Sequence, residues 1–397
     1  MSAKELVKKL LSYADIEING SRRWDIQVND ERLYDRVIAD QSLGLGESYI
    51  EGWWDCARID EMMAKLIDAK INHKLKNNLR LSFQLILHRI FNYQTKRQSK
   101  QSVHHHYDLG NNLFQHMLDK EMNYSCAFWE NASTLDEAQQ NKMELICQKL
   151  KLSPGMRLLD IGCGWGALAK YAAQNYGVEV LGITLSEQQK NLAADKCRSL
   201  PISIKLMDYR DLKGDFDRIV SVGMFEHVGY KNYPTFMHKA FQHLKDDGIF
   251  LLHTIGNSST EYSGDPWLNK YIFPQGMLPS ISQIGNAIEP YFVMEDWHNF
   301  GAYYDKTLMA WYQNFNKHWP TLEKQYDHSF YRMWHYYLLS CAGLSRARQI
   351  QLWQIVLSKN GLKGGYQYRY RPQQETQKQD IKDLQDRYVP QLNKSIL

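Results

Sequence analysis

The architecture of this chain can be predicted from the sequence Leu158-Leu159-Asp160-Ile161-Gly162-Cys163-Gly164-Trp165-Gly166-Ala167. An apolar strand ends in an acid and a glycine-rich turn, and an alanine-rich helix follows at residues 167–173. Glycines in the turn let a ligand approach the backbone, and the start of the helix offers N–H groups that lack helical partners. The spacing D-x-G-x-G-x-G differs from the G-x-G-x-x-G of dinucleotide-binding folds. The alternative interpretation is a tight turn that needs glycine only for packing.

The composition indicates a globular protein with more than one module, because 397 residues is long for a single domain. Aromatic residues make up 13% of the chain, which favours an aromatic-lined cavity or an apolar binding surface, although core packing could absorb them. The six cysteines are scattered without a C-x-x-C pair, so we expect a reducing, cytoplasmic setting and neither a disulfide framework nor a metal site. A net charge of only +4 argues against nucleic-acid binding. The sequence shows no signal-peptide pattern and no apolar run of the ~20 residues that span a bilayer.

Strands and helices alternate after residue 156, which predicts a mostly parallel sheet with helices on both faces. The predicted strands are 157–161, 178–183, 202–207, 216–222, 249–254, 291–297 and 352–357. The predicted helices are 167–175, 186–199, 234–244, 307–319 and 330–345. The glycine motif resembles the first motif of S-adenosylmethionine-dependent methyltransferases. That resemblance implies an α/β fold with the seven-stranded, Rossmann-like class I methyltransferase sheet, the last strand antiparallel and the ligand over the carboxyl ends of the strands.

Four segments are expected along the chain: a small, mainly helical N-terminal domain at 1–68, a basic amphipathic linker helix at 69–103, a catalytic domain at 104–364 and a polar tail at 365–397. From Ala69 through Tyr107 the sequence has no acidic residue. The linker helix therefore fits either the anionic headgroups of a lipid surface or a solvated basic face on a helix packed against its own protein. Residues 256–290, rich in Gly, Ser, Pro and aromatics, form an insertion that could cover a substrate.

Polar side chains after the second and third predicted strands are candidates for binding a nucleoside. Thr184 and Gln189 could hold ribose hydroxyls in place of the acid that methyltransferases often carry there. Ser186 and Gln189 also fit the cap of the following helix, which is a strong alternative. Asp208 could meet an adenine amino group, and Tyr209 could stack on the ring.

Three other side chains could carry chemistry. Glu226 follows the fourth predicted strand, where it is either a catalyst or an acid that begins a helix. His253 lies at the end of the fifth strand among apolar residues, where a satisfied core histidine is the more common outcome. Cys126 precedes the glycine motif, and a lone cysteine is usually a small buried hydrophobe.

Taken together, these segments resemble the cyclopropane-fatty-acyl-phospholipid synthase family, to which the mycolic acid cyclopropane synthases are related. The resemblance runs from about Ala14 to Ser358. The motifs that carry it are His106-Tyr107-Asp108-Leu109-Gly110-Asn111, Tyr124-Ser125-Cys126, the glycine motif, Phe225-Glu226-His227-Val228-Gly229, His253-Thr254-Ile255-Gly256, Trp267-Leu268-Asn269-Lys270-Tyr271-Ile272-Phe273-Pro274, Trp297-His298-Asn299-Phe300-Gly301 and Tyr304-Asp305-Lys306-Thr307-Leu308. Residues 42–49 and 52–54 also match, which favours the long bacterial phospholipid enzymes over the shorter mycolic-acid relatives.

The resemblance implies that a methylene passes from S-adenosylmethionine to a cis double bond of an unsaturated phospholipid acyl chain through a carbocation. Bicarbonate is the base in that scheme, held by Cys126, Glu226, His253, Ile255 and Tyr304. S-adenosylmethionine would be bound by Tyr124, Ser125, Asp160, Gly162, Gly164, Gly166, Thr184, Leu185, Gln189, Asp208 and Tyr209.

Further roles follow from the same resemblance. Aromatic rings such as Tyr304, Trp267 and Phe273 would stabilise the cation. Cys341 has been considered a nucleophile in this family, but a scheme without a covalent enzyme step favours a structural role, and it stays a weak catalytic candidate. The enzyme would work as a cytoplasmic protein at the inner face of the membrane, docked on anionic headgroups, and would dimerise through its N-terminal module.

Two other functions stay open. The first is a methyltransferase of the same fold that methylates a lipid or small molecule without closing a ring. The second is a non-catalytic lipid-binding protein that keeps the cofactor fold as a scaffold.

Overall fold

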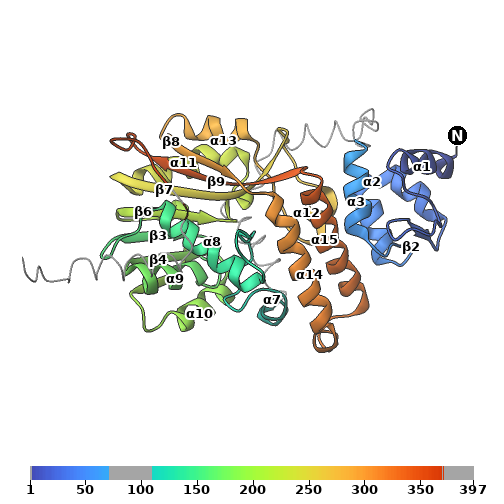
Figure 1. The fold of residues 1–397 in the computed structure, drawn as a ribbon, viewed down its shortest axis with the longest axis horizontal. Helices are drawn as coiled ribbons and strands as arrows, with labels where there is room; N and C mark the ends of the chain where they lie inside the picture. The colour runs from blue at the N-terminus through green and yellow to red at the C-terminus, as the bar shows by residue number, and fades with distance from the viewer. Residues whose placement is uncertain (1, 71–109, 369, 371–397) are drawn as a thin grey trace, which may run out of the picture.

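The computed structural model describes residues 2–70, 110–368 and 370, which Figure 1 shows as a coloured ribbon. The predicted linker helix at 69–103 lies outside the described residues beyond Lys70, and so does the predicted tail beyond Tyr370.

The N-terminal part contains the helices α1 (Ala3–Ser12), α2 (Arg32–Ile50) and α3 (Ile59–Asp68), and the short antiparallel strands β1 (Gln27–Val28) and β2 (Trp54–Asp55). α2 and α3 pack against α15 (His328–Arg346), and α2 also contacts α12 (Pro266–Tyr271). Arg346 joins this part to the rest of the molecule, because its guanidinium pairs with Asp60 of α3 at 2.7 Å and with Asp305 at 2.9 Å. Figure 1 shows the resulting arrangement, with the N-terminal helices beside α14 (Ala302–Leu322) and α15.

A seven-stranded sheet forms the centre of the larger part, in the order β5-β4-β3-β6-β7-β9-β8. Its strands are β3 (Arg157–Ile161), β4 (Glu179–Thr184), β5 (Ile202–Leu206), β6 (Phe216–Val222), β7 (Leu244–Asn257), β8 (Val293–Asn299) and β9 (Ile350–Ser358). β9 runs antiparallel to both of its neighbours, and the pairs from β5 to β7 are parallel. The predicted seven-stranded sheet with an antiparallel last strand is therefore confirmed.

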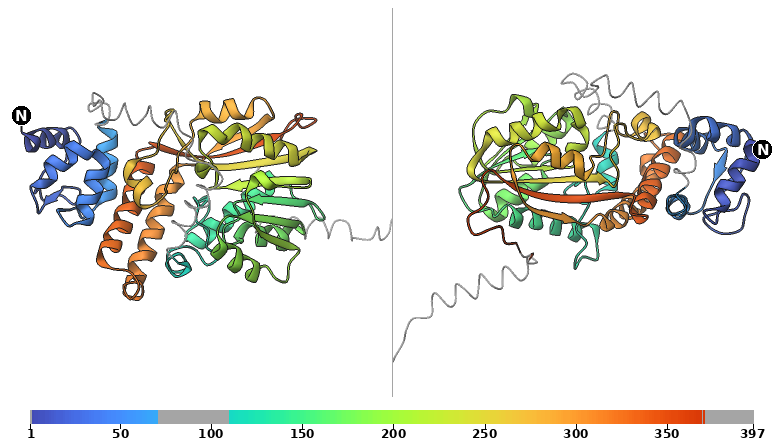
Figure 2. Two further views of the ribbon diagram at one scale, coloured as in Figure 1. Left: turned by 180° about the vertical axis from the view of Figure 1, so that it is seen from behind. Right: turned by 90° about the horizontal axis from the view of Figure 1, so that it is seen from above.

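Alternate residues of each strand face two separate cores, as the period of two in a strand requires. On one face Leu159 and Phe250 pack with α11 (Tyr233–His243) and α13 (Ile281–Ile288). On the other face Leu158 and Leu251 pack with α8 (Leu135–Lys149) and α9 (Ala167–Tyr176). Figure 2 shows the sheet between these two layers of helices. α10 (Glu187–Lys196) packs beside β4 and β5, and α7 (Asn111–Met117) beside α14.

Two expectations need correction. The predicted helix 234–244 ends at His243, and Leu244 instead begins β7, where its extended backbone pairs with Phe216. The polar tail was expected to begin at residue 365, outside the catalytic domain, but its first part packs on that domain. The Tyr366 hydroxyl donates to the carbonyl oxygen of Lys149 at 2.9 Å, and the Tyr370 ring lies 5.2 Å from the ring of Phe128.

Within the described ranges, no helix has both the length and the apolarity that crossing a bilayer would require.

The central position of β3 makes a test of the fold possible. Leu159 is 0% exposed in the middle of the sheet, so Leu159→Ala should lower the free energy of unfolding by about 3 kcal/mol through lost burial and an unfilled cavity. Leu206 lies on the edge strand and is 41% exposed, so the same truncation there should cost about 0.5 kcal/mol. Urea denaturation of both variants measures the difference, and equal losses would contradict this placement of β3.

Candidate active site

The glycine motif forms the floor of a pocket at the carboxyl ends of β3, β4 and β6. Gly162, Gly164 and Gly166 all have positive φ, between +53° and +88°. At Gly162 an added Cβ would lie 2.7 Å from the Cβ of Met224, so the position excludes any larger side chain. Gly166 is the N-cap of α9 and does not line the pocket.

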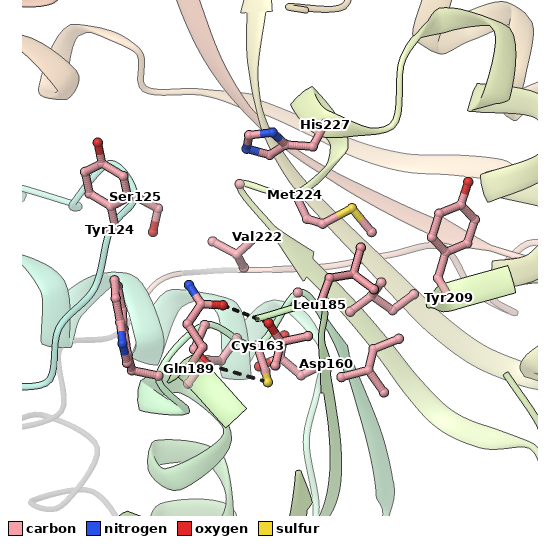
Figure 3. A pocket seen from close by; sticks show the side chains of 18 of the residues that line it. Tyr124, Ser125, Asp160, Cys163, Leu185, Gln189, Tyr209, Val222, Met224 and His227 are labelled. Carbon is pink, nitrogen blue, oxygen red and sulfur yellow. Dashed lines mark hydrogen bonds between the residues drawn. The ribbon is translucent and has the colours of Figure 1, made fainter. Parts of the chain in front are cut away.

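The other predicted contacts of the cosubstrate all line this pocket. Figure 3 shows Tyr124 and Ser125 on one side, Tyr209 on the other, and Asp160 and Gln189 below. The complete set of predicted residues in the lining is Tyr124, Ser125, Asp160, Gly162, Gly164, Thr184, Leu185, Gln189, Asp208 and Tyr209.

Hydrogen bonds within the pocket modify two of the predicted roles. The Thr184 hydroxyl donates to Gln189 Oε1 at 2.8 Å, and the Gln189 N–H donates to Ser186 Oγ at 3.3 Å. The Gln189 backbone thus takes part in the cap of α10, while its side chain turns to Thr184 beside the pocket. The carboxylate of Asp208 accepts two hydrogen bonds from the guanidinium of Arg210, at 2.8 and 2.7 Å, so Arg210 sets the orientation in which Asp208 can meet a ligand.

Two buried titratable groups line the pocket. Asp160 is 2% exposed, and burial raises its pKa to about 7. Lys142 of α8 also lines the pocket, and burial lowers its pKa to about 8. The Lys142 ammonium donates to Ser125 Oγ at 2.7 Å and to Asn123 Oδ1 at 3.3 Å.

A second polar group lies at the ends of β6 and β7, outside the lining of the pocket. Glu226 Oε1 accepts a hydrogen bond from the Ile255 N–H at 2.7 Å. Its other carboxylate oxygen, Oε2, is buried without a hydrogen-bond partner among the described residues. Burial raises the pKa of Glu226 to about 7. The Ile255 N–H is thus occupied by Glu226 and orients that carboxylate.

His253 is 1% exposed on β7, and burial holds its pKa well below the usual range, so the imidazole is neutral. Its Nδ1 lies 3.3 Å from Gln354 Nε2. Its Nε2 is buried and, in the part of the chain that the structure describes, has no hydrogen-bond partner. A neutral histidine whose Nδ1 accepts from Gln354 carries its proton on Nε2 and can donate it to a bound group.

The remaining catalytic candidates gather around Tyr304. Its hydroxyl is deeply buried, and electrostatic interactions connect it with Cys126, Glu226 and Cys341. The Cys126 thiol lies 3.9 Å from the Thr307 hydroxyl, and burial holds its pKa far above the usual range. Burial likewise raises the pKa of Cys341 to about 12, which leaves a thiol rather than a nucleophilic thiolate and favours the structural interpretation.

The aromatic candidates separate in space. Phe273 lies near the pocket, with its ring 6.5 Å from Tyr124 and 6.0 Å from His227. Trp267 instead packs against Tyr336 at 4.7 Å and against Gly46 of the N-terminal part, where an added Cβ would lie 2.4 Å from the indole. Its role is therefore to hold α12 on α2.

Several lining residues have no counterpart in the predictions. They are Asn123, Lys142, Trp165, Met224, His227, Pro274 and Gln275. Trp165 lies in the glycine motif and His227 next to Glu226, so both are adjacent in sequence to predicted site residues. Lys142 lies mid-helix in α8, and its reach into the pocket depends on tertiary packing that no local pattern records.

Comparisons with known proteins identify the family. A family model described as mycolic acid cyclopropane synthetase matches residues 94–355. This chain belongs to that family. It is 53% identical over 361 residues to the cyclopropane-fatty-acyl-phospholipid synthase of Escherichia coli K12. The aligned region covers 90% of this chain and 94% of that protein. It is also 37% identical over 279 residues to a probable fatty acid methyltransferase of Pseudomonas putida, with 66% and 70% coverage.

Among solved structures, the family member CmaA1, a mycolic acid cyclopropane synthase crystallised with SAH and CTAB, superposes with a TM-score of 0.62. The two chains are 33% identical, and the match covers 66% of this chain and 98% of the other. The predicted family and the class I methyltransferase fold are thereby confirmed.

The close approach at Gly162 predicts a loss of cosubstrate binding in Gly162→Ala. The added methyl both strains the left-handed backbone and collides with Met224, so the affinity for S-adenosylhomocysteine, measured by calorimetry, should fall at least about tenfold. Gly155 also has positive φ, at +82°, but an added Cβ there meets nothing within 4 Å. Gly155→Ala is the matched control and should bind normally; an equal loss in both variants would mean that backbone strain alone is responsible.

Proposed function

We propose that this chain is an S-adenosylmethionine-dependent cyclopropane synthase that acts on cis double bonds in the acyl chains of phospholipids. The observation that carries the proposal is the buried Glu226–Ile255 contact beside the cosubstrate pocket, with Glu226 Oε2 and His253 Nε2 both lacking partners among the described residues. Simple methylation of an oxygen or nitrogen needs no such buried polar group. The identity to the Escherichia coli phospholipid enzyme over nearly the whole length of both chains supports the substrate class.

The reaction has two bond-forming steps. The π electrons of the alkene attack the methyl carbon of the sulfonium, the C–S bond breaks, S-adenosylhomocysteine leaves and a carbocation is left on the acyl chain. A C–H bond of the new methyl group then supplies the electrons of the second C–C bond, which closes the ring and releases one proton to a base. An alkene is a weak nucleophile, so the first step depends on the alignment of the double bond with the sulfonium.

The buried polar group fits a bound bicarbonate, which would supply the base for the released proton. His253 Nε2 and the Tyr304 hydroxyl can donate hydrogen bonds to an anion, and Glu226 Oε2 can accept one from a protonated oxygen. Buried polar atoms without partners are costly, so Glu226 Oε2 and His253 Nε2, both near the ends of the neighbouring strands β6 and β7, support a bound ligand. Cys126 closes this region beside Tyr304 as a neutral thiol.

The surroundings of the reaction are dry and aromatic. Tyr304 packs edge-on against Trp311, which is 0% exposed, and Phe273 packs against Tyr124 of the cosubstrate pocket. Ring faces attract a carbocation, and the exclusion of water protects it from capture as an alcohol.

We further propose that the enzyme works as a peripheral protein on the cytoplasmic face of a membrane, on anionic and unsaturated phospholipids, and as a homodimer. The basic sequence between Ala69 and Tyr107 supports attraction to anionic headgroups.

Lipid mass spectrometry tests the function directly. Incubation with S-adenosylmethionine and vesicles of cis-unsaturated phospholipid should add one methylene to each modified chain, and the product should resist ozonolysis because the double bond is gone. A methylated chain that ozone still cleaves would instead establish a methyltransferase that does not close the ring.

Glu226→Gln tests the polar group separately from the pocket. The amide keeps the shape of the carboxylate but replaces one acceptor oxygen with an N–H donor. Depending on its orientation, it loses either the acceptor at Oε2 or the hydrogen bond from Ile255. The rate of ring closure should therefore fall about 100-fold or more. Affinity for S-adenosylhomocysteine should be unchanged, because Glu226 does not line the pocket. The control is Glu261→Gln, the same change on an exposed loop. Turnover of Glu226→Gln equal to that of the control would refute the role.

A further inference from the structure

The lining of the cosubstrate pocket contains a cationic side chain, Lys142, to which the proposed reaction assigns no role. Lys142 is 2% exposed, and its side chain reaches from the middle of α8 into the lining of the pocket. A buried lysine is expensive unless its charge is compensated and its N–H groups are bonded. Its presence at a site that binds a cationic sulfonium therefore requires a physical reason.

The first part of the reason is mechanical. Lys142 donates to Ser125 Oγ at 2.7 Å and to Asn123 Oδ1 at 3.3 Å. One turn earlier on the same helix, Gln139 Nε2 donates to the carbonyl oxygens of Ser125 at 2.9 Å and Asn123 at 3.3 Å. α8 thus holds residues 123–125, and with them Tyr124, as one wall of the pocket.

The second part is electrostatic. The charged and titratable groups that face Lys142 are Asp119, Cys126, Asp160 and His253. Those that face Asp160 are Lys142, Cys147 and Cys163. The cysteines are thiols with raised pKa values, and Asp119 receives two hydrogen bonds from Asn123. Lys142 is consequently the positive charge that acts on Asp160.

We propose that Lys142 is a positioning residue for the cosubstrate: it favours the carboxylate form of Asp160, which receives a cationic group of S-adenosylmethionine, and it holds Ser125 in the wall of the pocket. This inference rests on the binding of S-adenosylmethionine in the pocket, which is part of the proposed function, but not on ring closure. S-adenosylmethionine carries an ammonium and a sulfonium against one carboxylate. A buried acid attracts these cations only when it is ionised.

The charge balance gives a pH dependence with a definite sign. Burial raises the pKa of Asp160, and the ammonium of Lys142 lowers it again. Lys142→Gln keeps a hydrogen-bond donor at the site but removes the charge, so the pKa of Asp160 should rise further. The carboxyl is then protonated at neutral pH, and below its pKa each pH unit weakens cosubstrate binding about tenfold.

The experiment is calorimetric titration of the full chain with S-adenosylhomocysteine, which carries the same ammonium, at pH 6.5, 7.5 and 8.5. Lys142→Gln should bind roughly tenfold more weakly than wild type at pH 6.5 and should recover most of the difference at pH 8.5. Gln139→Leu is the matched control, since it releases the same segment without changing a charge. Its loss of affinity should be the same at every pH.

A double-mutant cycle distinguishes the effect of the Lys142 charge on Asp160 from a structural effect of the substitution. Asp160→Asn should bind weakly at every pH, and adding Lys142→Gln to it should cause no further pH-dependent loss. A pH-independent loss in Lys142→Gln, or the same pH-dependent loss in the Asp160→Asn background, would overturn the inference. Wild type that fails to bind S-adenosylhomocysteine would overturn both this inference and the proposed function, whereas wild type that binds but closes no ring would refute the function alone.

Discussion

The site depends on one backbone arrangement: β3 lies between β4 and β6, and the turn after it is tied to β4. The N–H groups of Gly162 and Cys163 both donate to the carbonyl oxygen of Ile183, at 2.9 and 3.0 Å. These two hydrogen bonds fix the turn against β4, and Leu159 of the preceding strand is completely buried. The same bonds place Asp160 and Thr184 at neighbouring strand ends, so the pocket follows from the pairing of two parallel strands.

Around this floor the molecule uses burial to set the charges of its polar groups. Asp160 and Glu226 are both carboxyls with pKa values raised to about 7, but their partners differ. Asp160 faces an ammonium, which favours the carboxylate, whereas Glu226 Oε1 accepts from the Ile255 N–H and Oε2 has no hydrogen-bond partner among the described residues. These different surroundings support the different tasks proposed for the two carboxyls, Asp160 for the cationic cosubstrate and Glu226 for a hydrogen-bonding group beside the acyl chain.

Much of this could be predicted because the signals are local. The strands are recognisable from apolar runs bounded by turns, and the glycine motif and its acid lie within a few residues of one another. The predictions are wrong or incomplete where tertiary packing determines the position of a residue. Leu244 joins β7 because it pairs with Phe216, Trp267 turns to Gly46 of a distant helix, and Lys142 reaches the pocket only because α8 packs across the sheet. Neither the occupied N–H of Ile255 nor the turn of Gln189 toward Thr184 has a signature in sequence.

The chemistry of the reaction explains why Glu226 and His253 lie outside the lining of the cosubstrate pocket. A carbocation in direct contact with an ionised carboxylate would be captured as an ester, so a base for the ring-closing proton has to be near the new methyl group but oriented away from the charged carbon. The hydrogen bond from the Ile255 N–H to Glu226 Oε1 restrains the carboxylate near the end of β7, while the Phe273 ring lies 6.5 Å from that of Tyr124 in the pocket. The proposed bicarbonate would take the proton without forming a lasting bond to the chain. The sheet fixes the positions of His253 and Ile255, because both lie on β7, the strand that pairs with β6.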